Sequence, residues 1–108
     1  MFFALLEKQY KIYIMIRRLQ FCVYVLYSLK DHKLYVGYSE NLKQRLTSHF
    51  QGESASTAPR RPFRLIYCEY FYSMKDAKNR EQYLKTTAGK RGLKYIISNS
   101  LEDLSANS

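Results

Sequence analysis

Two kinds of hydrophobic periodicity follow one another along the chain. Three short runs are rich in aromatic and β-branched residues, which is typical of strands. These runs are FCVYVLYSL (21–29), LYVGY (34–38) and RLIYCEYFY (64–72). Apolar residues at helical spacing predict helices over about residues 41–50, 74–87 and 93–97. The order ββαβαα therefore predicts an α/β (α+β) fold, with a three-stranded antiparallel sheet flanked by helices.

The first two predicted strands are separated by the polar sequence KDHK (30–33), which predicts a hairpin. A two-residue turn centred on Asp31 and His32 would place Tyr24 and Tyr35 on the same face of the sheet. Buried tyrosines need a partner for the hydroxyl group, and many find one without a catalytic role.

The first predicted helix carries an apolar stripe of Leu42, Leu46 and Phe50. Arg45 and His49 are four residues apart, so they lie together along one edge of this stripe. Both side chains are then directed over the sheet surface. An ordinary amphipathic helix also carries such residues on its flank, and the helix alone favours that simpler interpretation.

The second predicted helix places a carboxylate, Glu81, in the middle of its apolar stripe. The stripe consists of Ala77, Leu84 and Ala88. A carboxylate that faces the core costs several kcal/mol unless a cation pairs with it. Glu81 is therefore either a metal ligand in a cleft or one half of a buried ion pair with Arg80 or Arg45. The helix pattern alone does not decide between these.

The charge of the chain narrows the class of partner. The 108 residues include 18 Lys and Arg but 9 Asp and Glu, which gives a net charge of +9. A small domain of this charge favours nucleic acid as the partner, with an anionic membrane surface second. The residues expected to contact nucleic acid form two groups, Arg60, Arg61 and Arg64, and Lys85, Lys90 and Arg91.

The two cysteines, Cys22 and Cys68, lie inside apolar runs and have no partners at zinc-binding spacing. They are expected to be reduced thiols in the core of a cytoplasmic protein.

The N-terminal twenty residues are harder to interpret. Glu7 and Lys8 interrupt the apolar run, so we expect neither a secretory signal nor a segment that spans a bilayer. Residues 1–20 are expected to be an extension that forms a short helix or strand packed on the domain, with Met15 as an alternative start. Residues 21–97 are expected to form the domain, and residues 98–108 a frayed polar tail.

The order of short motifs resembles the GIY-YIG nuclease superfamily, in its small single-domain bacterial branch. The resemblance covers about residues 21–97. Its first two motifs are Val23-Tyr24-Val25 and Tyr35-Val36-Gly37, with Val23 where the family's first motif has glycine. The later motifs are Arg45 with His49, Gly52, Ser56-Thr57, Arg60-Arg61-Pro62, Asp76-Ala77 and Arg80-Glu81.

The resemblance implies an endonuclease that hydrolyses phosphodiester bonds and depends on Mg²⁺ or Mn²⁺. Glu81 would hold the cation, which suits Mg²⁺ because this ion keeps most of its waters. Arg45 would bind the phosphate, and Tyr24 or Tyr35 would orient or deprotonate the attacking water. A phenol would need a lowered pKa to act as this base. His49 is the natural proton acceptor behind the tyrosine.

The leading hypothesis is an endonuclease acting on DNA, in repair, recombination or mobile-element processing. The alternative is a nucleic-acid-binding module, for DNA or RNA, that kept the fold without turnover. A third hypothesis, a basic RNA-binding protein associated with the ribosome, would not require the ordered set of Tyr24, Tyr35, Arg45, His49 and Glu81.

Overall fold

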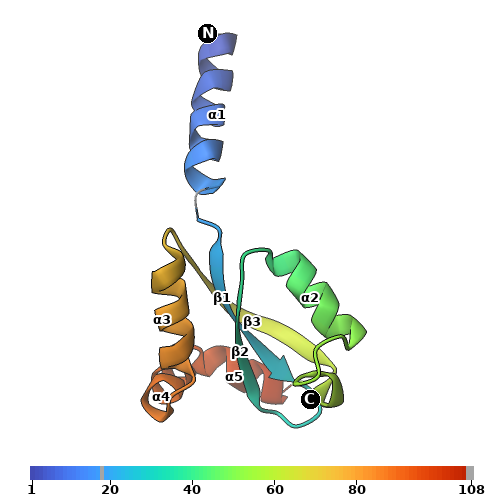
Figure 1. Ribbon diagram of the computed structural model, residues 1–108. Coiled ribbons are helices and arrows are strands. Elements are labelled where there is room, and N and C mark those ends of the chain that lie inside the picture. Colours follow the sequence, from blue (N-terminus) through green and yellow to red (C-terminus); the bar gives the residue numbers. More distant parts are fainter. Residues whose placement is uncertain (18, 107–108) are drawn as a thin grey trace.

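A computed structural model describes residues 1–17 and 19–106, and Figure 1 shows the arrangement of its elements. The strands are β1 (Phe21–Ser28), β2 (Leu34–Ser39) and β3 (Phe63–Phe71). The helices are α1 (Phe2–Arg17), α2 (Leu42–Gln51), α3 (Met74–Leu84), α4 (Thr87–Ile96) and α5 (Ser98–Ala106), with a short 3-10 helix, η1 (Ala58–Arg60). The predicted fold class, an antiparallel three-stranded sheet flanked by helices, is confirmed.

The sheet has the order β2-β1-β3, and β1 is antiparallel to both neighbours. The predicted two-residue turn is wrong, because the amide of Ser28 bonds to the carbonyl of Lys33 and the turn is longer. The register moves by two residues, so Tyr24 pairs with Gly37 instead of Ser39. A shift of two keeps every side chain on its face, and the prediction that Tyr24 and Tyr35 share a face is confirmed.

Each face of the sheet is covered by different helices (Figure 1). On one face α3 and α4 cover Val23, Val25 and Val36, and contribute Ala77, Leu84 and Leu93 to this core. On the other face α2 packs Leu42 and Leu46 against Cys22, Tyr24 and Leu26. Helix α2 starts at Asn41, whose side chain accepts a hydrogen bond from the Gln44 amide, and ends at Gly52 in the left-handed conformation.

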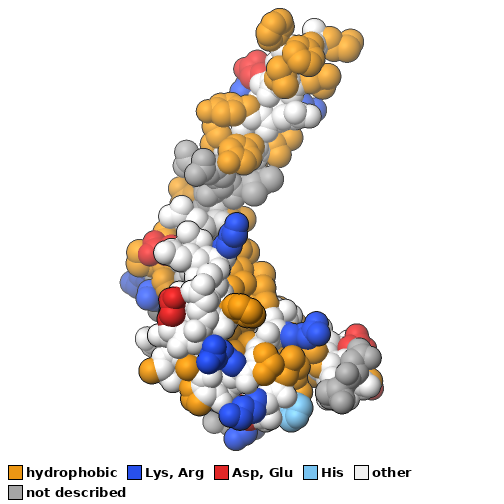
Figure 2. Space-filling model, turned by 90° about the vertical axis from the view of Figure 1, so that its right-hand side faces the viewer, with side chains coloured by type: hydrophobic (Ala, Val, Ile, Leu, Met, Phe, Trp, Pro, Cys, Tyr) orange, Lys and Arg blue, Asp and Glu red, His pale blue; other side chains and the backbone are white. Residues whose placement is uncertain are grey.

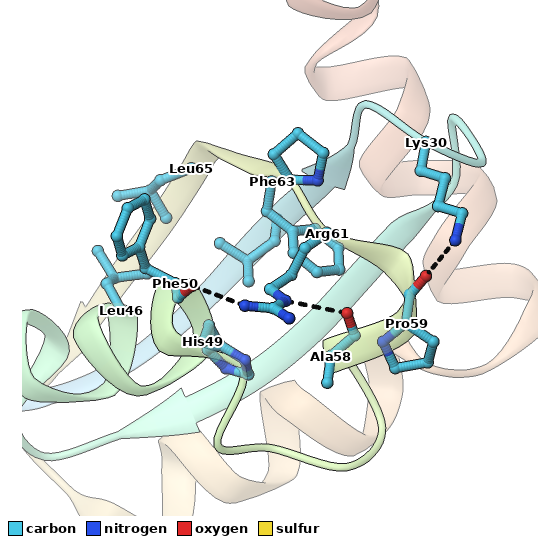
Figure 3. A pocket seen from close by; sticks show the side chains of 11 residues that line it. Lys30, Leu46, His49, Phe50, Ala58, Pro59, Arg61, Phe63 and Leu65 are labelled. Atoms are coloured by element: carbon cyan, nitrogen blue, oxygen red, sulfur yellow. Dashed lines mark hydrogen bonds between the residues drawn. The ribbon is translucent and has the colours of Figure 1, made fainter.

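Two members of the predicted apolar stripes lie outside the core. Phe50 is 83% exposed, because it lies at the end of α2 on the rim of an open hollow, beside Leu46 and Leu65 (Figure 3). Ala88 is exposed and belongs to α4, so it does not continue the buried side of α3.

The predicted helix over residues 74–87 is wrong at its end, because α3 stops at Leu84 and α4 starts at Thr87. Thr86 caps α4 by accepting a hydrogen bond from the Gly89 amide. A glycine just beyond the predicted helix, such as Gly89, favours a helix end, but Gly89 lies inside α4. A Cβ atom at Gly89 would overlap the backbone of Tyr83, so glycine is needed for the close approach of α3 and α4.

Both ends of the chain differ from expectation. The predicted frayed tail is wrong for residues 98–106, which form α5, with Leu101 packed against the core; residues 107 and 108 lie outside the described part. The N-terminal segment is a helix, one of the two predicted forms, but its predicted packing is wrong. Helix α1 extends away from the sheet (Figure 1), and the side chains of residues 1–15 are exposed. Hydrophobic side chains cover it, as the upper part of Figure 2 shows.

The cysteines are both free, but only Cys22 is buried. Burial raises the pKa of the Cys22 thiol to about 11, so it stays protonated. The expectation that Cys68 lies in the core is wrong, because Cys68 is exposed on β3. No described helix has the length and apolar character needed to cross a bilayer.

Candidate functional site

The hydroxyl group of Tyr24 is the meeting point of β1 and α2. His49 Nε2 lies 2.7 Å from this hydroxyl, and Arg45 Nε donates to it at 3.3 Å. Tyr24 is fully buried and His49 is 2% exposed. The structure therefore brings Tyr24, Arg45 and His49 together, and Arg45 and His49 lie on the same side of α2 as their spacing predicted.

Gly37 allows this arrangement because it lies opposite Tyr24 on β2. A Cβ atom at Gly37 would overlap the tip of the Tyr24 ring, so the ring can cross the backbone of β2 only at a glycine. Tyr35, two residues earlier, is half-buried and places its ring 5.3 Å from the imidazole ring of His49. Both tyrosines thus line the same site.

A fourth residue, Thr57, completes the network behind His49. Its hydroxyl lies 2.7 Å from His49 Nδ1, and the residue is fully buried. Because Arg45 donates to the Tyr24 oxygen, the Tyr24 O–H is available to donate to Nε2, and an Nδ1 proton then has the Thr57 hydroxyl as its acceptor. The Nε2 atom then carries a lone pair and accepts the Tyr24 proton. Hydrogen bonding thus assigns the tautomer of His49.

The loop that carries Thr57 is held by Arg61, as Figure 3 shows. The Arg61 guanidinium donates to the carbonyl oxygens of Phe50 at 3.1 Å and Ala58 at 3.0 Å. It packs so closely on Gly52 that a Cβ atom there would lie 2.6 Å from it. Ser28 fixes the end of the same loop by donating to the Arg60 carbonyl at 2.6 Å. Arg61 therefore positions the loop that carries Thr57.

Burial sets the protonation states in the site. It raises the pKa of Tyr24 to about 12, and the charges of Tyr35 and Glu81 add to this, against the lowering effect of Arg45. The pKa of His49 is lowered, first by burial and then by the charge of Arg45. A lowered tyrosine pKa was expected for a base; for Tyr24 the structure gives the opposite direction. At neutral pH the proton stays on Tyr24, and His49 is neutral.

Glu81 lies at the margin of the core on α3, with 16% of its side chain exposed. The predicted ion pairs with Arg80 or Arg45 are wrong, because Glu81 pairs with the exposed Lys85 at 3.1 Å. Arg80 instead pairs with Glu69 at 2.9 Å. The Glu81 charge is close enough to raise the pKa of Tyr24.

The surroundings of Glu81 fit a hydrated cation better than a chelated one. Among the described residues, no three His, Cys, Asp or Glu side chains gather into a metal-binding group. Tyr38 offers a second polar atom, since its hydroxyl is buried without a hydrogen-bond partner in the described part of the chain. The Glu81 charge also raises the pKa of Tyr38, after burial and the charge of Glu40. One carboxylate and one unsatisfied hydroxyl suit Mg²⁺ with most of its waters.

The residues expected to contact nucleic acid have different surroundings. Arg60 donates to Asp31 at 2.6 Å, and this guanidinium holds the pKa of the Asp31 carboxyl well below its usual range. Arg64 and the α4 residues Lys90 and Arg91 are exposed. The roles of all six in nucleic-acid contact stay predictions, although Arg60, Arg61 and Lys85 already have partners within the protein.

Thr57 and Tyr38 were not among the expected site residues. Thr57 lies in the Ser56-Thr57 motif, so the motif order contained a signal for it. Tyr38 stands three residues after Tyr35 in a strand, and the sequence does not show that its hydroxyl is left unpaired.

Comparison with known proteins agrees with the motif order. The family model described as the GIY-YIG catalytic domain matches residues 20–99. A UPF0213 protein of Clostridium perfringens is 37% identical over 82 residues, covering 75% of this chain and 87% of its own. A UPF0213 protein of Pediococcus acidilactici is 39% identical over 84 residues, covering 75% of this chain and 85% of its own.

A solved structure is also similar. The solution NMR structure of a UPF0213 protein from Bacillus halodurans is 30% identical in sequence, with a TM-score of 0.46. The match covers 70% of this chain and 83% of the other. Because the family model matches residues 20–99, from β1 to the end of α4 and the first two residues of α5, with every residue of the Tyr24 site inside it, the chain belongs to the GIY-YIG catalytic domain family.

Proposed function

We propose that this protein is a metal-dependent endonuclease that hydrolyses phosphodiester bonds in DNA. Membership of the GIY-YIG catalytic domain family supports a nuclease-type function. The observation that carries the proposal is the Tyr24 hydroxyl held between a neutral His49 and a charged Arg45. A site of this kind can move a proton from a water molecule while an anion is bound beside it.

The proton path follows from the hydrogen bonds. With its pKa near 12, Tyr24 does not act as a stored phenolate at neutral pH. Its oxygen can take a proton from the attacking water only if its own proton passes to His49 Nε2 in the same step, across the 2.7 Å bond. Thr57 then accepts the Nδ1 hydrogen bond and stabilises the imidazolium that forms. Tyr24 thus relays a proton that His49 finally holds.

Arg45 supplies the positive charge next to this relay. Hydrogen bonds to Tyr24 and, to a lesser extent, Tyr35 raise its pKa, so the guanidinium remains charged under all working conditions. A guanidinium binds phosphate oxygens and offsets the charge that develops on them in the transition state. Arg45 therefore binds the scissile phosphate beside the tyrosine that orients the water.

The residues that would hold a divalent cation are Glu81, through its carboxylate, and Tyr38, through a coordinated water. A bound Mg²⁺ or Mn²⁺ supplies a Lewis acid that polarises the phosphate and stabilises the leaving oxygen. Binding of the cation would displace Lys85 from Glu81, which is feasible because 52% of the Lys85 side chain is exposed.

A substrate panel tests the proposal. Purified protein with Mg²⁺ or Mn²⁺ is incubated with duplex, single-stranded, flap and branched DNA, and with matched RNA. We expect cleavage of at least one DNA substrate, with 5′ phosphate and 3′ hydroxyl ends, and none with EDTA. Tyr24→Phe removes the relay oxygen and is expected to abolish cleavage. Binding without cleavage of any substrate would instead support the nucleic-acid-binding module.

A further inference from the structure

A second hollow lies across the sheet from the Tyr24 site. It has a volume of about 1000 Å³ and is enclosed by the turn between β1 and β2, η1, α4 and α5. Tyr27, whose hydroxyl reaches its wall, faces the α4 side of the sheet, whereas Tyr24 faces α2. The hollow shares no lining residue with the Tyr24, Arg45 and His49 cluster, so it is a separate feature.

The lining of this hollow is strongly basic. Lys33, Lys90 and Lys94 contribute ammonium groups from exposed positions. The only carboxylate among the residues that line the hollow, Asp31, is already paired with Arg60 through two hydrogen bonds. The net charge of the lining is therefore positive.

Two features of the lining favour a bound anion. Lys90 and Lys94 are one turn apart on the same side of α4, an arrangement in which like charges repel. Helix α5 contributes Leu101 to the lining. The next two residues, Glu102 and Asp103, are exposed and are not among the lining residues. Apart from Asp31, which is paired with Arg60, no acidic side chain lines the hollow in the described part of the chain, so an anion placed between the two lysines would relieve their repulsion.

His32 at the rim of the hollow has a fixed position and a strained backbone. Its φ angle is 60°, in the left-handed region that non-glycine residues seldom adopt. Its Nδ1 atom is hydrogen-bonded to the hydroxyl of Tyr27 at 3.0 Å, and Tyr27 is 5% exposed. A buried anchor therefore holds an exposed imidazole at the edge of a basic hollow, where it adds a further hydrogen-bonding group.

The edge strand β2 connects this hollow with the catalytic cluster. Gly37 lies opposite Tyr24, and Lys33 immediately precedes β2. The four residue steps from Lys33 to Gly37 span about 14 Å along the strand, at roughly 3.4 Å per residue of antiparallel strand. A nucleic-acid strand advances about 3.4 Å per nucleotide, so this distance corresponds to about four nucleotides.

We propose that the basic hollow lined by Lys33, Lys90 and Lys94 binds the phosphate backbone of the substrate about four nucleotides from the scissile bond. The proposal rests on the proposed function in taking nucleic acid as the ligand. It adds a second anchor point, which would hold the substrate along the β2 edge and set the minimum length that binds fully.

The test compares Lys90→Gln/Lys94→Gln with a control that loses the same charge elsewhere, Lys8→Gln/Lys75→Gln, from exposed positions on α1 and α3. Binding of fluorescein-labelled DNA duplexes of increasing length is measured in EDTA, over a series of salt concentrations. We expect the Lys90/Lys94 variant to lower the salt slope by about 1.8, from two lost phosphate contacts. We also expect the length needed for full affinity to fall by about four base pairs in this variant and not in the control.

Two further arms separate the possible outcomes. Lys90→Arg/Lys94→Arg keeps both charges and is expected to restore the salt slope and the length requirement. A Lys90→Gln/Lys94→Gln protein with the same salt slope and the same length requirement as the control would overturn the proposal. In a second measurement, inorganic pyrophosphate is titrated while the NMR signals of His32 and Lys90 are followed. If these signals shift but the Gln substitutions leave DNA binding unchanged, the hollow is a site for small phosphates and the proposal is overturned.

The binding measurements contain no metal and need no cleavage, so they are independent of the catalytic proposal. Length-dependent binding without cleavage on any substrate would contradict the endonuclease and leave the hollow supported. Cleavage by the wild-type protein, together with unaltered DNA binding by the Lys90→Gln/Lys94→Gln variant, would support the endonuclease and contradict the role of the hollow.

Discussion

Replacing Thr57 by valine removes one hydroxyl group from the site and keeps the shape of the side chain. Thr57 is fully buried, and its hydroxyl accepts from His49 Nδ1 at 2.7 Å. The variant leaves the Nδ1 proton buried without an acceptor, which costs about 1–3 kcal/mol of folding free energy. For a domain of this size, each kcal/mol lowers the melting temperature by roughly 4–8 °C. We therefore expect a fall of about 10 °C.

Activity should fall for a separate reason. Without Thr57, the imidazole proton is free to move to Nε2, and His49 then donates to Tyr24 and cannot accept its proton. The productive tautomer loses the net value of one hydrogen bond, about 1–1.5 kcal/mol, which corresponds to about a tenfold fall in kcat. KM should hardly change, because Thr57 is shielded from solvent and does not reach the substrate.

The assay combines three measurements on the same protein. Thermal melting gives the stability loss, steady-state cleavage gives kcat and KM, and ¹⁵N NMR of the imidazole reports which nitrogen carries the proton. Thr57→Ser keeps the hydroxyl and should retain the tautomer. Thr47→Val is the matched control, since the exposed Thr47 hydroxyl donates to the Lys43 carbonyl within α2 and contacts no described residue of the site. A Thr57→Val protein with an Nδ1 proton and full kcat would refute the positioning role of Thr57.

Two further predictions concern Gly37 and pH. Gly37→Ala should cost about 1–3 kcal/mol of stability in melting experiments and lower kcat, because the added Cβ displaces the Tyr24 ring. The control is Gly92→Ala, which has no atom near its added Cβ and should stabilise the protein by up to about 1 kcal/mol. A Gly37→Ala protein with normal stability would contradict the close packing of Tyr24. Because burial lowers the pKa of His49, the pH profile of kcat/KM should have an acid limb centred below the ordinary value of 6.5 that is absent in His49→Asn. The stability that neutral His49 contributes should be present above pH 6.5 and be lost as the pH falls below that value. An acid limb of kcat/KM centred above pH 6.5 would contradict the lowered pKa of His49.

The sequence predicts most of the sheet because its strands have strong local signals. Aromatic and β-branched runs mark β1, β2 and β3, and a register error of two residues does not change which face Tyr24 occupies. Helix boundaries were less certain, since Gly89 has two possible roles. In isolation it indicates a helix end, but its real role depends on the contact with Tyr83, which no local pattern contains.

The site shows the same division between local and non-local information. The spacing of Arg45 and His49 places them on one side of α2, and the sheet supplies Tyr24. The sequence does not reveal that Glu81 pairs with Lys85, because i,i+4 pairing on one helix competes with every longer-range partner. It also does not reveal the direction of the Tyr24 pKa shift, since burial outweighs Arg45 only once the three-dimensional packing is known.

We propose that Glu81 holds the divalent cation that cleavage requires, beside the Tyr24, Arg45 and His49 cluster. The most direct test is a Mg²⁺ titration of cleavage by Glu81→Gln and the wild-type protein, with DNA binding and melting measured in parallel. Because the ion-pair partner of Glu81 in the described part of the chain is the exposed Lys85, which caps the C-terminal end of α3, we expect a stability change below about 0.5 kcal/mol. We expect unchanged DNA binding and a loss of cleavage of at least about a hundredfold at every Mg²⁺ concentration. A Glu81→Gln protein that cuts at the wild-type rate with the same Mg²⁺ dependence would contradict the claim.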